Sequence, residues 1–262
     1  MTPKKRAMSS DQAREVRAKG HADARQFALL IGLPNDYKND LKAKKDVIDH
    51  NGDAHSVKSG KAWWQIFLYS LNRIRSDYAF TAMNGVGQLI GECLNCFPQD
   101  RSDYLMDKAR YKKALEIPMK QISDKLQDKK RLAAFLAKSF FNGNEVQFLT
   151  IKHNDKYHIF YYKNVIDTLC ENFTITNSVA HQKDQFNNQK VLFKIDDKNA
   201  GELEVRTDSD VHYREIKFRL NKLKVLTLLQ LKIASKDEPI KINGADVNNK
   251  LIRYGAAIKK FK

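Results

Sequence analysis

The sequence predicts an α+β protein, and three observations support this class. The first half of the chain is mostly helical in pattern. A hairpin signal interrupts these helices, and the second half is rich in Val, Ile, Phe and Tyr, as strands are. With 42% hydrophobic residues, a chain of 262 residues can bury a sizeable core. This order favours one domain over residues 1–262, with a subdivision into residues 1–140 and a β-rich lobe at 141–262 as the alternative.

The first half is expected to be mainly helical. Residues 9–31 form the first expected helix, because Ser9 and Gln12 make a capping box and apolar residues recur at helical spacing. Gly32 and Pro34 then end this helix. Further helices are expected at residues 62–74, AWWQIFLYSLNRI, and at residues 81–140, with breaks near Gly85–Gly91 and Pro98.

The second half is expected to contain antiparallel strands. A polar tract at residues 177–190 has no core-forming pattern, which is typical of a loop. Residues 220–233, LNKLKVLTLLQLKI, suit a helix or a long strand, and the tail is expected to close with a short basic helix. The expected strands are residues 144–151, 156–163, 190–195, 201–207 and 211–220.

The charge of the chain indicates its class of partner. Lysine and arginine exceed aspartate and glutamate by 47 to 31, which gives a formal net charge of +16. An excess this large favours a polyanion, and nucleic acid is the default. No window approaches the roughly 20 apolar residues of a membrane span, so no membrane partner is expected. Three cysteines and the lack of a secretory pattern favour a reducing cytoplasm.

The hairpin signal is the dipeptide Asn51-Gly52, which favours a two-residue type I′ turn. With that turn, side-chain alternation places Asp49 on one face together with Ser56 and Lys58. Asp46 falls on the other face, unless a bulge shifts the register. The sequence therefore predicts Asp49 and Lys58 as neighbours.

A carboxylate and a lysine on adjacent strands suit metal-dependent hydrolysis of a phosphodiester. The carboxylate of Asp49 would hold Mg²⁺ through hard oxygen ligands. Lys58 would orient the attacking water and offset the developing charge. The alternative is an ordinary solvent-exposed hairpin with a weak cross-strand pair. Basic residues that would attract a phosphate backbone to this hairpin are Lys44, Lys45 and Lys61.

Residues 46–70, DVIDHNGDAHSVKSGKAWWQIFLYS, resemble the catalytic segment of type II restriction endonucleases of the PD-(D/E)XK superfamily. The specific match covers about residues 10–75, and residues 201–220 have a similar character. The resemblance implies a central mixed sheet flanked by helices, with additional C-terminal antiparallel strands. It also implies Mg²⁺-dependent cleavage of double-stranded DNA at a short sequence, without a nucleotide cofactor. For a palindromic site a two-fold homodimer is expected, in the cytoplasm of a bacterium or archaeon.

The resemblance also implies roles for individual residues. Asp49, or Asp46 in the variant register, is the metal-binding acid, and Lys58 is the motif lysine. Ser56 stands where the family usually has Asp or Glu, and a hydroxyl is a poor replacement for a metal-binding carboxylate. We therefore expect an acid from another element to complete the metal shell with Ser56. The candidates on the first helix are Glu15 and Asp23. Gln26 on the same helix is a carboxamide, which would weaken the affinity for the metal if it occupied the site.

Two alternatives remain open from the sequence. Glu215-Ile216-Lys217 is a literal E-x-K motif, so the same nuclease activity would then be centred on Glu215 and Lys217. We favour a structural or DNA-contacting role for these residues, because Glu204 and Arg214 are expected to face each other as an ion pair. The second alternative is a basic nucleic-acid-binding protein without catalysis. Residues expected to contact phosphates or bases are Arg73, Arg206, Arg214, Lys217 and Arg219.

Two further motifs are interpreted as structural. Cys93-Leu94-Asn95-Cys96 is half of a zinc site, and no second pair follows at finger-like spacing. GVGQLIG at residues 85–91 lacks the GxGxxG spacing and a preceding strand, which argues against a dinucleotide.

Overall fold

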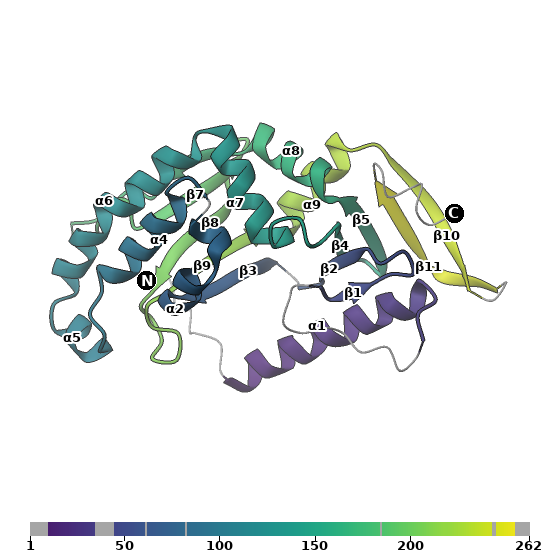
Figure 1. The fold of residues 1–262 in the computed structure, drawn as a ribbon, viewed down its shortest axis with the longest axis horizontal. Coiled ribbons are helices and arrows are strands. Elements are labelled where there is room, and N and C mark those ends of the chain that lie inside the picture. The colour runs from purple at the N-terminus through teal and green to yellow at the C-terminus, as the bar shows by residue number, and fades with distance from the viewer. Residues whose placement is uncertain are drawn as a thin grey trace. The chain divides into compact units, whose positions relative to one another are not determined.

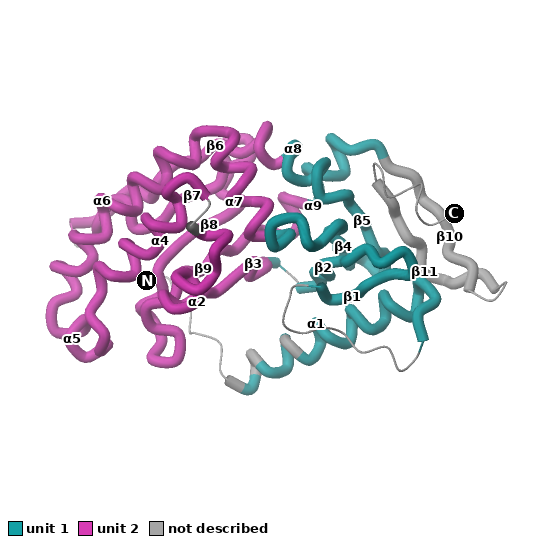
Figure 2. Tube along the Cα trace, in the orientation of Figure 1, with its two compact units in different colours: residues 1–62, 140–168, 226–262 teal, residues 63–139, 169–225 magenta. Residues whose placement is uncertain are grey.

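The computed structural model describes residues 10–34, 45–60, 62–81, 83–183, 185–242 and 245–254. The chain forms two compact units, each assembled from separate segments (Figure 2). Unit 1 comprises residues 1–62, 140–168 and 226–262, and unit 2 comprises residues 63–139 and 169–225. The chain thus passes between the two units repeatedly.

Unit 1 is built on a mixed six-stranded sheet, with the order β1-β2-β4-β5-β11-β10 (Figure 1). β2 pairs with β4 and β11 with β5 in parallel, and the other neighbours are antiparallel. The elements are α1 (Ser10–Leu30), β1 (Val47–Ile48), β2 (Ala54–Lys58), β4 (Phe148–His153), β5 (Lys156–Tyr161), β10 (Ser235–Ile242) and β11 (Ala245–Tyr254).

Helix α1 covers one face of this sheet and confirms the first expected helix. Phe27 packs its ring 5.0 Å from the ring of His55 and 5.2 Å from that of Tyr157, measured between centroids. The same buried cluster includes Val47 and Phe148. Because side chains alternate along a strand, these residues identify the face of the sheet that α1 covers.

Unit 2 is built on an antiparallel five-stranded sheet, with the order β3-β9-β8-β7-β6. Its strands are β3 (Trp63–Ser70), β6 (Thr174–Asn177), β7 (Lys190–Ile195), β8 (Lys198–Arg206) and β9 (Glu215–Asn221). Its helices are α2 (Leu71–Ser76), α3 (Tyr78–Thr81), α4 (Val86–Asn95), α5 (Arg101–Met106), α6 (Lys108–Leu126) and most of α7 (Lys129–Phe141). The chain crosses between units within α7, α8 (Tyr162–Asn172) and α9 (Lys222–Lys232).

The core of unit 2 is aromatic. The ring of Phe135 on α7 lies 5.1 Å from that of Phe218 on β9 and 5.9 Å from that of Phe193 on β7. Phe67 on β3 lies 5.7 Å from Phe218. Large aromatic surfaces of this kind dominate core energetics, so these contacts hold α7 against one face of the sheet.

Two expectations about helices are wrong. Residues 62–74 form strand β3 and then α2, instead of one helix. A short apolar run does not distinguish helix from strand, and antiparallel pairing with β9 decides the outcome here. The tail forms β10 and β11 up to Tyr254 where a basic helix was expected, and residues 255–262 lie outside the described residues.

The structure confirms the α+β class. Residues 81–140 are mainly helical, the expected strands appear as β4, β5, β7, β8 and β9, and residues 220–233 contain α9. No helix within the described part of the chain is long and apolar enough to span a membrane.

Gly87→Ala is expected to destabilise unit 2. A Cβ at this position of α4 would lie 1.9 Å from the carbonyl oxygen of Phe80, so the backbones would have to separate. Overpacking of this kind costs about 1–3 kcal/mol. Gly20→Ala on α1 is the matched control, because nothing lies within 4 Å of its Cβ. Urea unfolding of both variants checks this, and an unchanged stability for Gly87→Ala would contradict the close approach of α4.

Candidate active site

The turn of the first hairpin is wider than the sequence predicts. The N–H of Asp49 donates to the carbonyl of Asp53 at 3.0 Å, and the N–H of Gly52 donates to the carbonyl of Asp49 at 3.0 Å. Gly52 has a φ of 78°, whereas Asn51 is not among the residues with positive φ. The loop is therefore a type I turn followed by a left-handed glycine, and the predicted type I′ turn is wrong.

The carboxylate of Asp49 stabilises this wider turn. Its Oδ1 accepts hydrogen bonds from the N–H groups of Asn51 and Asp53, both at 2.9 Å. Aspartate side chains commonly bond to the backbone of a turn in this way. The Oδ1 of Asp49 is thus occupied by hydrogen bonds within the loop that this residue begins.

The wider turn shifts the strand register by one residue. Val47 lies opposite His55, where the predicted turn would have placed Ser56. A shift of one residue moves each side chain to the other face of the sheet. The observed register is therefore the variant one, in which Asp46 takes the place expected for Asp49.

Asp46 and Lys58 are the carboxylate and lysine that the hairpin brings together. The Nζ of Lys58 lies 3.9 Å from the Oδ2 of Asp46, and the same oxygen accepts the backbone N–H of Val57 at 2.7 Å. The two side chains are 21% and 30% exposed, respectively, so solvent reaches them. The expectation that Asp49 and Lys58 are neighbours is wrong, because the turn directs Asp49 to the opposite face.

Ser56 lies two residues before Lys58 on β2, so both side chains point to the same face of the sheet. The Oγ of Ser56 is buried and has no hydrogen-bond partner among the described residues. Buried hydroxyls are usually bonded, so this oxygen is an unsatisfied polar group inside the fold, closed to solvent although it lies on the same face as Lys58.

Asp49 instead belongs to a buried polar group beneath α1. Its Oδ2 lies 3.5 Å from Nε2 of His55, and Nδ1 of His55 lies 2.9 Å from Oγ1 of Thr150. Burial by itself raises the pKa of the Asp49 carboxyl, but the His55 ring and the backbone N–H groups of the turn outweigh it and lower the pKa. His55 and Thr150 are fully buried, so this group stabilises the fold and is closed to a substrate.

The polar residues of α1 contact the same covered face. The Nζ of Lys152 lies 2.7 Å from Oδ1 of Asp23 and 2.6 Å from Oε1 of Gln26. The hydroxyl of Tyr157 donates to Oε1 of Gln26 at 3.1 Å and to the carbonyl of Asp23 at 3.0 Å. Lys152 lies two residues after Thr150 on β4, which places this cluster on the α1 side of the sheet.

The structure does not bring the helix candidates together with Lys58. Asp23 and Gln26 are bonded to Lys152, on the face of the sheet opposite to Lys58. Glu15 is exposed on α1. The expected completion of a metal shell by an acid of this helix is therefore not observed.

Asp46 could supply one protein ligand to Mg²⁺, with water and a substrate phosphate as the remaining ligands. Within the described residues, no group of three or more His, Cys, Asp or Glu side chains could hold a metal. Asp46 offers one solvent-reachable carboxylate, whereas the hydroxyl of Ser56 is fully buried. Since Mg²⁺ commonly binds through one or two carboxylates plus substrate phosphates and water, this donor set fits an ion that arrives with a phosphate.

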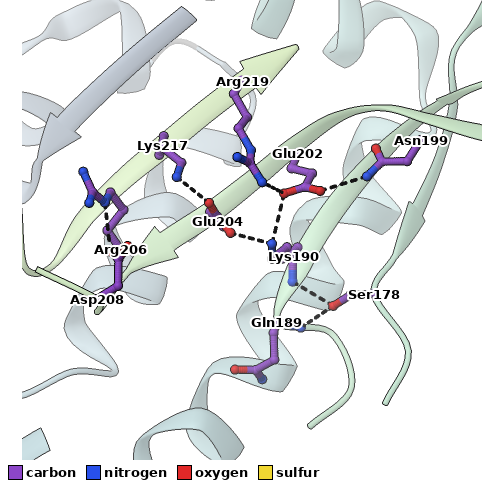
Figure 3. A network of polar contacts seen from close by, with 10 residues as sticks. All are labelled: Ser178, Gln189, Lys190, Asn199, Glu202, Glu204, Arg206, Asp208, Lys217 and Arg219. Atoms are coloured by element: carbon purple, nitrogen blue, oxygen red, sulfur yellow. Dashed lines mark hydrogen bonds and ion pairs between the residues drawn. The ribbon is translucent and has the colours of Figure 1, made fainter. Parts of the chain in front are cut away.

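Charged residues of β7, β8 and β9 form a network on one face of the unit 2 sheet (Figure 3). Lys190 Nζ lies 3.0 Å from Glu202 and 2.7 Å from Glu204, and these acids also bind Arg219 and Lys217 at 2.7 and 2.6 Å. Burial alone raises the pKa of Glu202, but Arg219 and Lys190 outweigh it and lower the pKa to about 2. Each cation expected to contact DNA here is held by a carboxylate.

The alternative E-x-K residues are paired separately. Oε2 of Glu215 lies 2.7 Å from Nδ1 of His212, while Lys217 binds Glu204. Glu215 and Lys217 alternate along β9 and point to one face, but each has its own partner. This arrangement suits a structural polar face, in which cross-strand pairs stabilise the sheet.

The other basic residues expected to contact DNA also have partners where they are described. Arg73, Arg206 and Lys45 each form an ion pair with a carboxylate, at N–O distances of 3.3, 3.0 and 3.2 Å. The Nε of Arg214 donates to a main-chain carbonyl at 3.3 Å. Contact with DNA would require these side chains to exchange their partners. The residues of this set outside the described part are Lys44 and Lys61.

Sequence reasoning missed the partners that unit 1 supplies from distant strands. Thr150, Lys152 and Tyr157 are more than 90 residues from the hairpin or helix residues that they contact. The only sequence signal was the strand pattern of their segments, which does not say which helix or strand lies beside them.

Comparison of the chain with protein-family models, with curated proteins and with solved structures gives no match. The site is therefore interpreted from its own geometry and chemistry.

Asp49→Asn is expected to reduce the loss of stability in acid. The folded pKa of Asp49 lies below its ordinary value of 3.8, so its contribution is present above that pH and is lost as the pH falls through the folded pKa. Asparagine keeps an acceptor for the turn but does not titrate. Urea unfolding at pH 7 and about pH 3 checks this.

Asp124→Asn removes an exposed carboxylate of α6 and serves as the control. An acid-induced loss of stability in Asp49→Asn equal to that of the unsubstituted chain would contradict the assignment.

Proposed function

We propose that this protein is a Mg²⁺-dependent, sequence-specific endonuclease of double-stranded DNA, of the type II restriction class. The proposal is supported chiefly by one observation, the solvent-reachable pair of Lys58 on β2 and Asp46 immediately before β1 in a mixed sheet. The resemblance of residues 46–70 to the PD-(D/E)XK nucleases places the motif lysine at Lys58. The net charge of +16 supports a polyanionic substrate.

In this proposal, each residue of the pair has a distinct task. The carboxylate of Asp46 binds Mg²⁺, which when bound polarises the phosphate and lowers the pKa of a water molecule. Lys58 orients the attacking water by a hydrogen bond and offsets the negative charge that develops on the phosphorane oxygens. Ser56 lies on the same face of β2 but is fully buried, so it takes no direct part in this step.

Sequence-specific cutting of a palindrome would require two copies of the site. A two-fold homodimer supplies them, because the symmetry of the protein then matches that of the DNA.

A basic DNA-binding protein without catalysis is the second candidate. It is favoured by the absence, among the described residues, of a group of three metal-binding side chains. The two candidates differ in one measurable property, which is cleavage in the presence of a divalent metal.

Lys58→Ala is expected to reduce Mg²⁺-dependent cleavage of plasmid DNA by about 10²-fold or more, because charge stabilisation in the transition state is lost. Binding of the same DNA, measured by gel shift without divalent metal, should change far less. Asp46→Asn should likewise abolish cleavage, by weakening the hold on the metal.

Two lysine variants serve as controls for this test. Lys120→Ala removes an exposed cation of α6 and should retain cleavage. Lys217→Ala tests the alternative centre at Glu215 and Lys217. If Lys217→Ala loses cleavage while Lys58→Ala keeps full activity, the active site lies on β9. If the protein binds DNA in a salt-sensitive way but does not cleave it with any divalent metal, the nuclease proposal is wrong and the non-catalytic candidate is supported.

A further inference from the structure

Unit 2 contains a cavity of about 440 Å³ among α2, α3 and α4. This volume lies within the range of small-molecule pockets, about 300–1,000 Å³. The lining combines an apolar floor, bare helix backbone and polar side chains. Ile74, Phe80 and Gly91 contribute the apolar part of the lining, and its polar side chains are Arg75, Gln88, Glu92 and Asn95.

The floor of the cavity is apolar and well supported. Ile74 and Phe80 are 4% and 1% exposed, and Leu71 lies beside them. The ring of Phe80 is fixed by edge contacts with Phe67 and Tyr69, at centroid distances of 6.3 and 5.6 Å. A rigid apolar floor of this kind suits a flat, largely apolar ring.

Two glycines of α4 line the cavity, and only one of them lies where a side chain would clash. Gly87 must be glycine, because a Cβ would meet the carbonyl oxygen of Phe80 at 1.9 Å. At Gly91 a Cβ would meet only Cδ1 of Leu71, at 3.8 Å, which is an ordinary contact. Glycine inside a helix costs about 0.5–1 kcal/mol relative to alanine, so Gly91 keeps the cavity open at the expense of helix stability.

Polar side chains line the cavity beside this floor. The Nε2 of Gln88 donates to Oε1 of Glu92 at 2.9 Å, which leaves acceptor oxygens of both side chains available. Asn95 adds a further amide one turn along α4. Arg75 forms no ion pair with any residue that the structure describes, although it carries a full positive charge.

We propose that this cavity binds one nucleotide of the DNA strand, extruded from the base stack, whose base carries an exocyclic amino group. The base lies in the cavity against Leu71 and the helix backbone at Gly91, above the buried Ile74 and Phe80, and Glu92 accepts a hydrogen bond from the amino group. The amides of Gln88 and Asn95 bond to the remaining edge, and Arg75 binds the phosphate. This inference rests on the proposed function. The cavity would suit many flat ligands, and a DNA substrate is the reason to expect a nucleotide. The GVGQLIG segment then shapes a base pocket, which is a different role from a dinucleotide loop.

Titration calorimetry of the full chain with mononucleotides tests the chemistry of the cavity. We expect dAMP and dCMP to bind at least about tenfold more tightly than dTMP, which has no exocyclic amino group. Gly91→Ala should weaken dAMP binding about tenfold, because its methyl group occupies the open space. Gly20→Ala on α1 makes the same substitution where nothing lies nearby, and should bind dAMP as the unsubstituted chain does. Glu92→Gln should lose the preference for dAMP over dTMP.

A DNA duplex that contains 2-aminopurine tests the source of the nucleotide. The fluorescence of this base rises when it leaves the stack, and we expect a rise on binding that Gly91→Ala reduces and Gly20→Ala retains. Mononucleotide binding without this rise would overturn the assignment to DNA in favour of a free nucleotide. Absence of both signals, or a rise that Gly91→Ala leaves unchanged, would overturn the site itself.

Lys58→Ala separates this inference from the proposed function. If it abolishes cleavage while dAMP binding persists, both assignments stand. If the unsubstituted chain binds dAMP selectively but never cuts DNA, the nuclease proposal fails and the cavity remains a nucleotide site.

Discussion

The carboxylate of Asp49 controls the geometry on which the candidate site depends. By accepting the N–H groups of Asn51 and Asp53, it stabilises a wide turn in place of the tight one that Asn51-Gly52 favours in isolation. The extra loop residue shifts the pairing of β1 and β2 by one position. Since a one-residue shift exchanges the faces of a strand, this turn decides that Asp46, and not Asp49, lies beside Lys58.

The sheet of unit 1 separates two kinds of polar residue. The face beneath α1 holds bonded groups, in which His55 joins Asp49 to Thr150 and Lys152 joins β4 to Asp23 of the helix. Buried polar groups must find partners, and these contacts provide them. The opposite face leaves the Asp46 and Lys58 pair reachable by solvent. The strand that carries Lys58 is thus held on its other face by these bonded groups.

In unit 2 the charged sheet face is internally paired, whereas the helical side contains a cavity. Lys190 of β7 and Lys217 and Arg219 of β9 are paired with Glu202 and Glu204, so most of the positive charge on this sheet face is offset by these two carboxylates. The low pKa of Glu202 reflects how strongly those pairs hold it ionised. On the helical side, Gly87 permits close packing, while Gly91 leaves space that packing does not require. The cavity is therefore a better candidate for ligand binding in this unit than the paired sheet face.

The sequence by itself determined the α+β class, helix α1, the helical region at residues 81–140 and most of the strands. These features depend on local periodicity and turn residues. The tertiary structure alone decided that residues 63–70 form a strand, because an apolar run becomes β3 only when β9 pairs with it. It also decided the face on which each hairpin aspartate lies. Asp46 and Asp49 have the same chemistry and are three residues apart, so only the turn and its backbone hydrogen bonds distinguish the one beside Lys58 from the one beneath α1.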